Sequence, residues 1–279
     1  MMESWSSDTL RSAALRLHQA GVENPGYDTT KLFESCLGKR IYSLNREEIN
    51  AIPGKIWSSF ENLISLREQR MPVAKIINEK EFWGRSFHVN TEVLDPRPDT
   101  EILIKEAISE EFGQFLDLGV GSGCLLVTLL AENPAAYGIG SDISSSCISV
   151  ARMNIKRFGL KDRCKLITSD WFSEINCNFD LIISNPPYIS KDEYETLQPE
   201  IRYFEPRIAL TLEDDGLGSY RKIASEAGKY LNRGGRLIIE IGFGKYHQVK
   251  RIFERTNLSL ENEIPDLCGI TRVLVFRKV

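Results

Sequence analysis

Apolar residues recur at helical spacing through the first seventy residues of the chain. The pattern predicts helices over residues 10–20, 31–37 and 56–70. Between the last two, Asn45 followed by Glu48 resembles a capping box that opens a short helix. We therefore expect a small helical bundle in this part of the chain, and it carries no visible chemistry.

The helical pattern breaks at Met71-Pro72, and a different kind of segment follows. Aromatic and apolar residues on both sides of Gly84 predict a β-hairpin. Two prolines within residues 94–101 then fix an extended backbone, and Asp99 or Thr100 is placed to cap the helix that begins next. This segment marks the predicted boundary between two parts of the chain.

From residue 114 onward, short apolar runs alternate with helical patterns. Five of these runs read as strands: residues 115–118, 137–139, 165–168, 181–183 and 237–241. Such alternation predicts a mostly parallel sheet with helices on both faces. Two last runs, residues 259–264 and 273–276, have only a loop between them, which predicts an antiparallel hairpin at the end of the sheet.

The chain is thus predicted to fold in three parts. We expect a helical domain over residues 1–75, a linking β-hairpin over residues 76–95 and a larger domain over residues 96–279. The fold class is α/β: a doubly wound, mostly parallel, seven-stranded sheet of Rossmann-like type, with a small N-terminal helical bundle.

Composition and charge narrow the classes of function. Hydrophobic residues make up 42% of the chain and charged residues 27%, as in a folded globular protein. The net charge of −4 lacks the basic surplus from which most nucleic-acid-binding proteins take their affinity. No apolar run is long enough to span a membrane, and the first eight residues lack the basic and apolar regions of a signal peptide. We expect a cytoplasmic protein.

The six cysteines and three histidines do not form a recognisable catalytic or metal-binding pattern. No cysteine pair or histidine stands at metal-ligand spacing, so we expect no metal. In a chain without a secretion signal, the cysteines are expected to be reduced and buried. Ser-His-Asp chemistry also lacks its parts.

A glycine-rich loop, Gly119-Val120-Gly121-Ser122-Gly123, follows the first predicted strand of the sheet. Ligands of open α/β sheets bind at the carboxyl ends of the strands, and glycines let the backbone approach a ligand closely. The N-terminus of the next helix favours a carboxylate or a phosphate. The third glycine comes one residue earlier than in the dinucleotide fingerprint G-x-G-x-x-G, which indicates a different cofactor.

Residues at the ends of the next two strands indicate which cofactor this is. Asp142 closes the second strand and is placed to accept hydrogen bonds from both hydroxyls of a ribose. Asp170 closes the third strand and could accept from an adenine amino group, while Trp171 offers a flat face to the ring. Each acid alone could simply cap the helix that follows it. Three successive strands that end in this way favour a site for S-adenosylmethionine.

The fourth predicted strand runs into Asn185-Pro186-Pro187-Tyr188, the most specific motif in the chain. A planar amide or amino nitrogen is a poor nucleophile because its lone pair is delocalised. If the Asn185 side-chain oxygen and the Pro186 carbonyl each accept one N–H, the nitrogen is held toward the methyl group. Tyr188 can pack on the flat substrate group, and the prolines stiffen the loop. The motif resembles the loop of class I methyltransferases that alkylate such nitrogens.

The sequence as a whole resembles the HemK/PrmC family of release factor glutamine methyltransferases. The motifs that carry this resemblance cover residues 70 to 220 densely. They are Arg70-Met71-Pro72-Val73, Glu81-Phe82-Trp83, Pro96-Arg97-Pro98-Asp99-Thr100-Glu101, the glycine loop, Ser169-Asp170-Trp171-Phe172, Asn185-Pro186-Pro187-Tyr188-Ile189, Phe204-Glu205-Pro206 and Asp215-Gly216-Leu217. The segment that begins at Pro96 distinguishes this family from DNA adenine methyltransferases, which share the Asn-Pro-Pro-Tyr motif.

The resemblance implies a reaction and roles for the motif residues. It implies methyl transfer from S-adenosylmethionine to N5 of the glutamine in the Gly-Gly-Gln motif of class I peptide-chain release factors. By the same likeness, the loop from Gly119 to Gly123 holds the methionine end, Asp142 the ribose and Trp171 the adenine. The segment from Asn185 to Tyr188 holds the glutamine amide, and Asn185 also borders the cofactor. The helical domain grips the release factor, and residues 96–101 wall the pocket.

Two other functions share parts of this pattern. A DNA or RNA adenine N6-methyltransferase would use the same loop, but it must flip its base and hold the phosphate backbone. Residues 81–279 carry 24 basic and 29 acidic residues, net −5, which disfavours that function. A cofactor-binding module without catalysis would have no need of Asn185. We expect a protein substrate, no direct nucleic-acid partner, no membrane and a monomer.

Two charged residues near these motifs have competing interpretations. Glu240, at the end of the fifth predicted strand, is interpreted as a polar group at the sheet end rather than as a base. For Arg97, a structural salt bridge and a contact with substrate are equally open.

Overall fold

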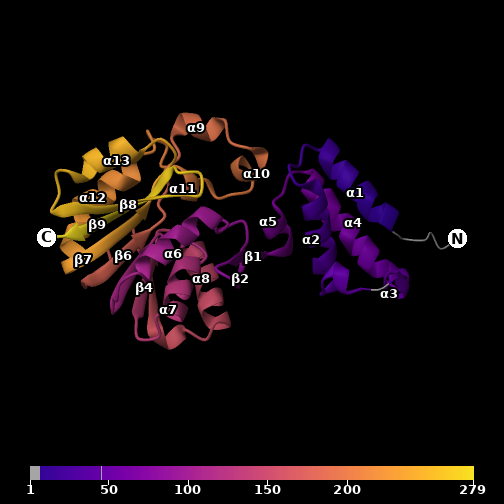
Figure 1. Cartoon of the computed structure of the whole chain (residues 1–279), viewed down its shortest axis with the longest axis horizontal. Coiled ribbons are helices and arrows are strands. Elements are labelled where there is room, and N and C mark those ends of the chain that lie inside the picture. Colours follow the sequence, from indigo (N-terminus) through magenta and orange to yellow (C-terminus); the bar gives the residue numbers. More distant parts are fainter. Residues whose placement is uncertain (1–6, 45) are drawn as a thin grey trace. The chain divides into compact units, whose positions relative to one another are not determined.

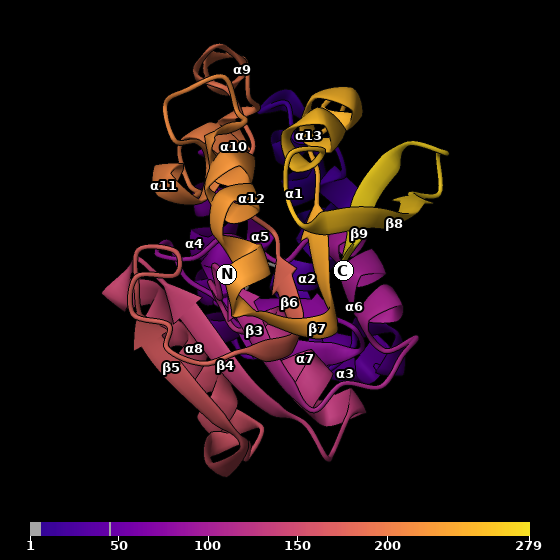
Figure 2. The same ribbon diagram turned by 90° about the vertical axis from the view of Figure 1, so that its left-hand side faces the viewer.

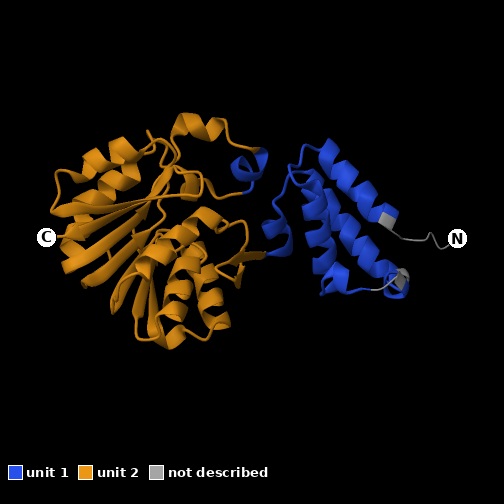
Figure 3. Cartoon of the chain, in the orientation of Figure 1, with its two compact units in different colours: residues 1–78, 199–204 blue, residues 79–198, 205–279 orange. Residues whose placement is uncertain are grey.

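A computed structural model describes residues 7–44 and 46–279, so the predicted capping box at Asn45 lies outside the described residues. The chain divides into two compact units (Figure 3). The helical unit comprises the described residues up to Asn78 together with Pro199–Phe204. The sheet unit comprises Glu79–Gln198 and Glu205–Val279.

The helical unit confirms the bundle that the apolar spacing predicts. Its helices are α1 (Ser7–Gln19), α2 (Pro25–Leu37), α3 (Arg46–Asn50), α4 (Gly54–Glu68), α5 (Val73–Ile77) and α10 (Pro199–Arg202), with a short 3₁₀ turn at Ile41–Ser43. An aromatic cluster fills the centre: the rings of Phe33 and Trp57 stack with centroids 4.6 Å apart, and Phe60 meets Phe33 edge-on. Helix α2 begins earlier than predicted because Pro25 fits the first helical turn.

The sheet unit contains the predicted seven-stranded sheet. Its strands are β3 (Gln114–Leu118), β4 (Tyr137–Asp142), β5 (Cys164–Thr168), β6 (Phe179–Ser184), β7 (Leu231–Glu240), β8 (Leu258–Pro265) and β9 (Thr271–Lys278). Their order is β5-β4-β3-β6-β7-β9-β8, which Figure 2 shows from β5 on one edge to β8 on the other. The first five run parallel, and β9 pairs antiparallel with both β7 and β8.

Two hydrophobic clusters cover the two faces of this sheet, as expected for a doubly wound fold. Helices α6 (Glu101–Ala107), α7 (Cys124–Glu132) and α8 (Ser145–Arg157) pack on one face, and α12 (Gly218–Tyr230) and α13 (Tyr246–Phe253) on the other (Figure 1). The short helices α9 (Lys191–Glu195) and α11 (Arg207–Leu210) lie in the connection between β6 and α12. In the described part of the chain, no helix has the length and apolar character needed to cross a membrane.

The predicted β-hairpin forms from β1 (Glu79–Phe82) and β2 (Arg85–His88). Trp83 and Gly84 connect the strands with φ of 49° and 65°, the two positive values of a type I′ turn. Phe82 and Phe87 are buried in the cluster that contains α7 and α8, so the hairpin is part of the sheet unit.

The expected cap of the next helix takes a different form. The segment after the hairpin turns through a 3₁₀ helix, Pro98–Thr100, and Thr100 stands at the N-cap position of α6. The prediction that its side chain caps this helix is wrong, because the Thr100 hydroxyl donates instead to the carboxylate of Glu240 at 2.7 Å. The Asp99 side chain makes no cap bond to α6 either.

Candidate active site

A pocket opens in the sheet unit at the carboxyl ends of β3, β4, β5 and β6. Its empty space is about 1170 Å³, open solvent at its mouth included. The predicted site residues among those that line it are Gly119, Val120, Gly121, Ser122, Asp142, Asp170, Trp171, Asn185, Pro186 and Pro187. These residues come from four separate connections, and the parallel order of the strands brings them together.

The glycine loop is held open toward this pocket. The backbone N–H groups of Gly119 and Val120 donate to the Ser141 carbonyl at 2.9 and 2.8 Å, which joins the loop to β4. Gly119 and Gly121 have positive φ, and no atom lies within 4 Å of where their Cβ atoms would stand. Gly123 differs: it is not among the lining residues, and a Cβ there would meet Ala151 of α8 at 3.2 Å. Its place in the fold is the tight turn into α7.

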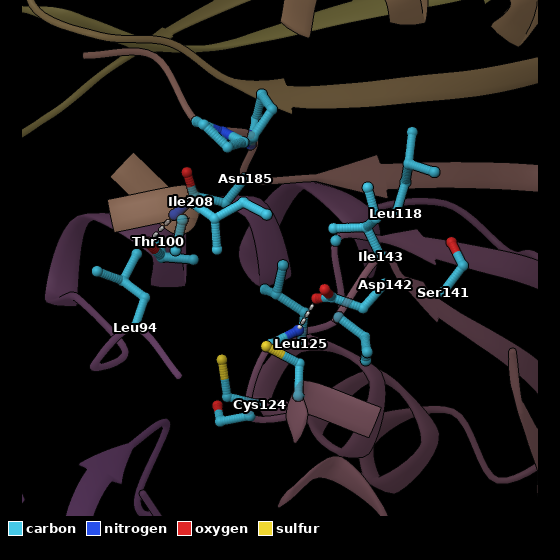
Figure 4. Close-up of a pocket in the computed structure, with 18 of the residues that line it drawn as sticks. Leu94, Thr100, Leu118, Cys124, Leu125, Ser141, Asp142, Ile143, Asn185 and Ile208 are labelled. Atoms are coloured by element: carbon cyan, nitrogen blue, oxygen red, sulfur yellow. Dashed lines mark hydrogen bonds between the residues drawn. The ribbon is translucent and has the colours of Figure 1, made fainter. Parts of the chain in front are cut away.

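Asp142 connects the loop to the pocket wall. One carboxylate oxygen accepts the Gly121 N–H at 3.0 Å (the dashed line at Asp142 in Figure 4). The other oxygen accepts the Ser144 N–H at 2.9 Å. Burial raises the pKa of this carboxyl, against the effect of these hydrogen bonds. The cap of α8 is Ser144, whose hydroxyl accepts from the Cys147 N–H, and not Asp142. The acid therefore borders the pocket and also fixes the loop.

The end of β5 supplies an aromatic wall. Trp171 is half-buried and lines the pocket in a left-handed conformation with φ of 50°. The Ser169 hydroxyl donates to the Trp171 carbonyl at 2.9 Å and accepts the Glu174 N–H at 3.1 Å, so it holds this unusual turn. Asp170 also lines the pocket and is exposed.

The Asn-Pro-Pro-Tyr loop lies beside the glycine loop, where β6 ends. The Ser184 hydroxyl donates to the Leu118 carbonyl at 2.7 Å, which joins the ends of β6 and β3. The Asn185 side-chain amide donates to the Thr100 hydroxyl at 3.1 Å (Figure 4). Tyr188 is not among the residues that line the pocket, and its hydroxyl donates to Glu240 at 3.3 Å.

Glu240 is a buried carboxylate at the carboxyl end of β7. Its two oxygens accept the hydroxyls of Thr100 and Tyr188, and its side chain is almost fully enclosed. Burial raises its pKa to about 7, although both hydroxyls favour the charged form. Asp99 raises this pKa further and Arg272 lowers it.

The segment that includes Pro96 and Arg97 forms another wall of the pocket. Arg97 donates to Glu205 at 3.0 Å, and the other oxygen of Glu205 accepts the Asp95 N–H at 3.2 Å. The Glu205 side chain is only 1% exposed, so this ion pair anchors the wall to the connection that precedes α11. Arg97 thus has a structural salt bridge, and it also faces the pocket.

The residues of the pocket fit S-adenosylmethionine. The open space at Gly119 and Gly121 lets a ligand approach the backbone of the glycine loop. Asp142 presents a carboxylate of the kind that binds ribose hydroxyls. Trp171 adds an aromatic wall at the neighbouring strand end. Among the described residues, no group of three or more His, Cys, Asp or Glu side chains is arranged to hold a metal ion.

Comparison with known proteins identifies the family. Residues 8–77 match the PrmC N-terminal domain, and residues 93–201 match the methyltransferase small domain. A release factor glutamine methyltransferase from Cereibacter sphaeroides is 41% identical over 98% of this chain and 98% of its own length. The chain belongs to the release factor glutamine methyltransferase family. Relatives of the same name from Agrobacterium fabrum and Caulobacter vibrioides are 38% and 35% identical, over 98% and 99% of this chain and 97% and 95% of their own lengths.

Solved structures agree with the fold of this family member. A methyltransferase from Pyrococcus furiosus has a TM-score of 0.52 at 17% identity, over 79% of this chain and 98% of that one. A 16S rRNA N2 G1207 methyltransferase from Thermus thermophilus, solved with AdoMet and guanosine, has a TM-score of 0.51 at 16% identity. This second match covers 72% of this chain and 50% of that one. At these identities the likeness concerns the fold.

Three residues at the site of this release factor glutamine methyltransferase family member have roles that sequence patterns did not reveal. Thr100 was expected to cap a helix, Glu240 to be a polar group at a sheet end, and Glu205 stood only within a matching motif. All three are buried and make hydrogen bonds to residues more than eighty positions away. The only available signal was a buried-strand pattern that ends in an acid at Glu240.

Proposed function

We propose that this protein transfers the methyl group of S-adenosylmethionine to N5 of the glutamine in the Gly-Gly-Gln motif of class I peptide-chain release factors. One observation carries the proposal: Asn185 and Pro186 line the same pocket as the glycine loop and Asp142, in a chain of the release factor glutamine methyltransferase family. The residues proposed to hold the substrate amide and those proposed to bind the cofactor thus line the same pocket.

Each group has a part in this reaction. Gly119 to Ser122 and Asp142 bind the cofactor, with Trp171 against its adenine, and Gly123 provides the turn into α7. The cofactor supplies an electrophilic methyl group whose bond to sulfur breaks with its electron pair remaining on sulfur. The side-chain oxygen of Asn185 and the Pro186 carbonyl each accept one N–H of the glutamine amide, which aims the nitrogen lone pair at the methyl carbon. The nitrogen forms one new bond to carbon and then loses one proton to water.

Rigidity of the loop supports this assignment. The Pro187 carbonyl accepts the Ser219 hydroxyl at 2.6 Å, and both prolines restrict the backbone on either side. Tyr188 is fixed by its bond to Glu240 and does not line the pocket, so in our proposal it supports the loop. Preorganised acceptors of this kind lower the barrier without a strong base.

The remaining parts of the chain complete the proposal. Residues 1–75 act as the recognition domain for the release factor, residues 76–95 as the hairpin linker and residues 96–279 as the methyltransferase domain. The protein acts as a monomer, in the cytoplasm, on a protein substrate and without direct nucleic-acid contacts. The net charge of −4 supports a protein substrate over a nucleic acid.

A methylation assay tests the proposal. The protein is incubated with methyl-labelled S-adenosylmethionine and either a purified class I release factor or duplex DNA. We expect label on the glutamine of Gly-Gly-Gln, located by mass spectrometry of peptides, and none on DNA. Label on adenine and none on the release factor would support the adenine methyltransferase alternative and refute this proposal.

The variant Asn185→Ala isolates the role of the loop. We expect its kcat to fall by about 100-fold or more, because one of two acceptors that orient the nitrogen is lost. Its Kd for S-adenosylmethionine, measured by calorimetry, should change by less than about three-fold. Unchanged turnover would show that the Asn185 side chain does not hold the substrate amide.

A further inference from the structure

Four side chains from three separate segments form a continuous hydrogen-bonded chain, and the Asn-Pro-Pro-Tyr loop supplies two of them, Asn185 and Tyr188. Asn185 donates to the Thr100 hydroxyl at 3.1 Å, and Thr100 donates to Glu240 Oε2 at 2.7 Å. Tyr188 donates to the second oxygen, Glu240 Oε1, at 3.3 Å. Thr100 and Glu240 are each only 3% exposed, so water does not substitute for these partners.

The direction of each bond follows from the donor and acceptor inventory. A hydroxyl has one proton to donate and lone pairs that accept. Because the Thr100 proton points to the Glu240 carboxylate, the Thr100 oxygen can only accept from Asn185. The amide of Asn185 must therefore turn its NH₂ toward Thr100 and its carbonyl oxygen away from it. That oxygen is the group that a substrate N–H needs.

We infer that Glu240 and Thr100 are positioning residues that set the orientation of the Asn185 amide for methyl transfer. This inference rests on the function proposed above and extends it from the loop to Thr100, which lines the pocket, and to Glu240, which does not. Sheet register makes the arrangement possible: β6 and β7 are parallel neighbours with Ser184 opposite Ile239, so Asn185 and Glu240 follow side by side.

Protonation of Glu240 would reverse the direction of the hydrogen bonds that connect Glu240, Thr100 and Asn185, which we call the relay. A neutral carboxyl can donate to Thr100, whose proton then turns to Asn185 and attracts its carbonyl oxygen. The NH₂ group of Asn185 would then face the substrate N–H. Because both groups are donors, no hydrogen bond could form between them. The charged groups that act on Glu240 are Asp99, which raises its pKa, and Arg272, which lowers it, beside the hydroxyls of Thr100 and Tyr188. Activity should therefore fall as the pH drops below about 7.

The first test compares Thr100→Val with Thr100→Ser, with release factor as the substrate. Valine keeps the shape but cannot accept from Asn185, so we expect kcat to fall by about 30- to 100-fold with little change in the KM of either substrate. Serine keeps the hydroxyl and should restore kcat to within about three-fold. Thr128→Val is the matched control, since its buried hydroxyl has no partner in the described part of the chain and lines no part of the pocket.

The second test uses the pH profile of kcat for Glu240→Gln and Glu240→Leu. Glutamine can still accept from Thr100, so we expect it to retain turnover while it loses the acidic limb that we expect near pH 7 in the parent. Leucine cannot accept, and its kcat should fall as in Thr100→Val. Thermal unfolding and the Kd for S-adenosylmethionine are measured for every variant, to separate misfolding from misorientation.

The outcomes separate this inference from the proposed function. If the parent protein fails to methylate release factor, the proposed function itself is wrong. If the parent is active and Thr100→Val matches Thr100→Ser, the positioning role is refuted. An acidic limb that persists in Glu240→Gln would show that another group titrates, and Glu240 would lose its part in the relay. Loss of kcat in Thr100→Val together with loss of the limb in Glu240→Gln supports the inference.

Discussion

Asp117 is a buried carboxyl group just before the glycine loop, and its burial favours the protonated form. Asp117 closes β3 and is fully enclosed. One of its oxygens accepts the Leu126 N–H at 3.0 Å, and the other has no hydrogen-bond partner among the described residues. Burial raises the pKa of Asp117 to about 7, and the nearby charge of Asp142 adds to the effect. The folded chain thus holds a proton here that the unfolded chain releases near pH 4.

This difference makes stability depend on pH in a stated direction. Between about pH 4 and 7 the folded state binds more protons than the unfolded state at Asp117, so its contribution to the free energy of unfolding falls as the pH rises. Asp117→Asn removes this titration. We expect the stability of the variant relative to the parent to increase by about 3 kcal/mol between pH 5 and pH 8, from the shift in pKa. Urea unfolding of both chains without cofactor measures it, and an equal difference at both pH values would contradict it.

Sequence patterns predicted the positions of the acidic residues of the site but not their hydrogen-bond partners. Asp142, Asp170 and Glu240 all follow short apolar runs, so each could be placed at the carboxyl end of a strand. The partners of Glu240 could not be found in this way, because Thr100 is 140 positions away in the chain. Which side chains meet there depends on the lateral order of strands, and no local spacing encodes that order.

At the scale of elements, one asparagine joins the hairpin, α8 and the glycine loop. Asn154 of α8 donates to the Ser122 carbonyl at 2.8 Å and to the His88 carbonyl at 2.9 Å, and it accepts the His88 N–H at 2.8 Å. Its side chain is fully buried. The amide thus satisfies three backbone groups that water does not reach, and it links the end of β2 to the glycine loop.

Replacement of this residue should therefore affect both stability and cofactor binding. We expect Asn154→Ala to lower the free energy of unfolding by roughly 3 kcal/mol or more, because three buried backbone groups lose their partner. The Kd for S-adenosylmethionine should rise as well, since the Ser122 carbonyl is no longer held. The control is Asn232→Ala, an exposed residue whose side chain donates to Asp180, with an expected change within about 0.5 kcal/mol. Calorimetry and chemical unfolding give both quantities, and equal losses in the two variants would refute this role for Asn154.

Elements were predictable where their apolar pattern was long enough to have a period. All seven strands of the sheet and helices α1, α4, α7 and α8 follow such patterns. Helices α5 and α10, of five and four residues, complete barely one turn, so no periodicity could reveal them. The position of α10 depends instead on tertiary contacts, above all on the ion pairs of Glu200.

At the scale of the molecule, a short segment from the middle of the chain belongs to the helical unit. Residues 199–204 follow the catalytic loop and α9, yet they are assigned with residues up to Asn78. Glu200 of α10 accepts from Arg70 at 2.6 Å through both oxygens and from Arg67 at 3.1 Å. Arg67 also donates to Asp28 of α2 at 2.7 Å. Burial would raise the pKa of Glu200, and the bonds from Arg70 and Arg67 outweigh it and lower the pKa.

This ion cluster holds α10 against α2 and the end of α4 within the helical unit. We expect Glu200→Gln to lower the free energy of unfolding by about 2–3 kcal/mol, because two largely buried guanidinium groups lose their carboxylate. The KM for release factor should rise several-fold, while the Kd for S-adenosylmethionine stays within about two-fold, since the pocket lies wholly in the sheet unit.

A matched glutamate separates this role from a general loss of charge. Glu79 pairs with Arg157 at 2.8 Å, but both side chains are more than 40% exposed, so Glu79→Gln should change stability by less than about 1 kcal/mol. Unfolding curves and release-factor kinetics are compared for the two variants. If Glu200→Gln behaves like Glu79→Gln in both measurements, the ion pairs of Glu200 contribute neither to stability nor to binding of the release factor. A selective rise in the KM for release factor would instead show that the ion cluster of Glu200 positions the protein substrate, while the methyl donor binds independently of it.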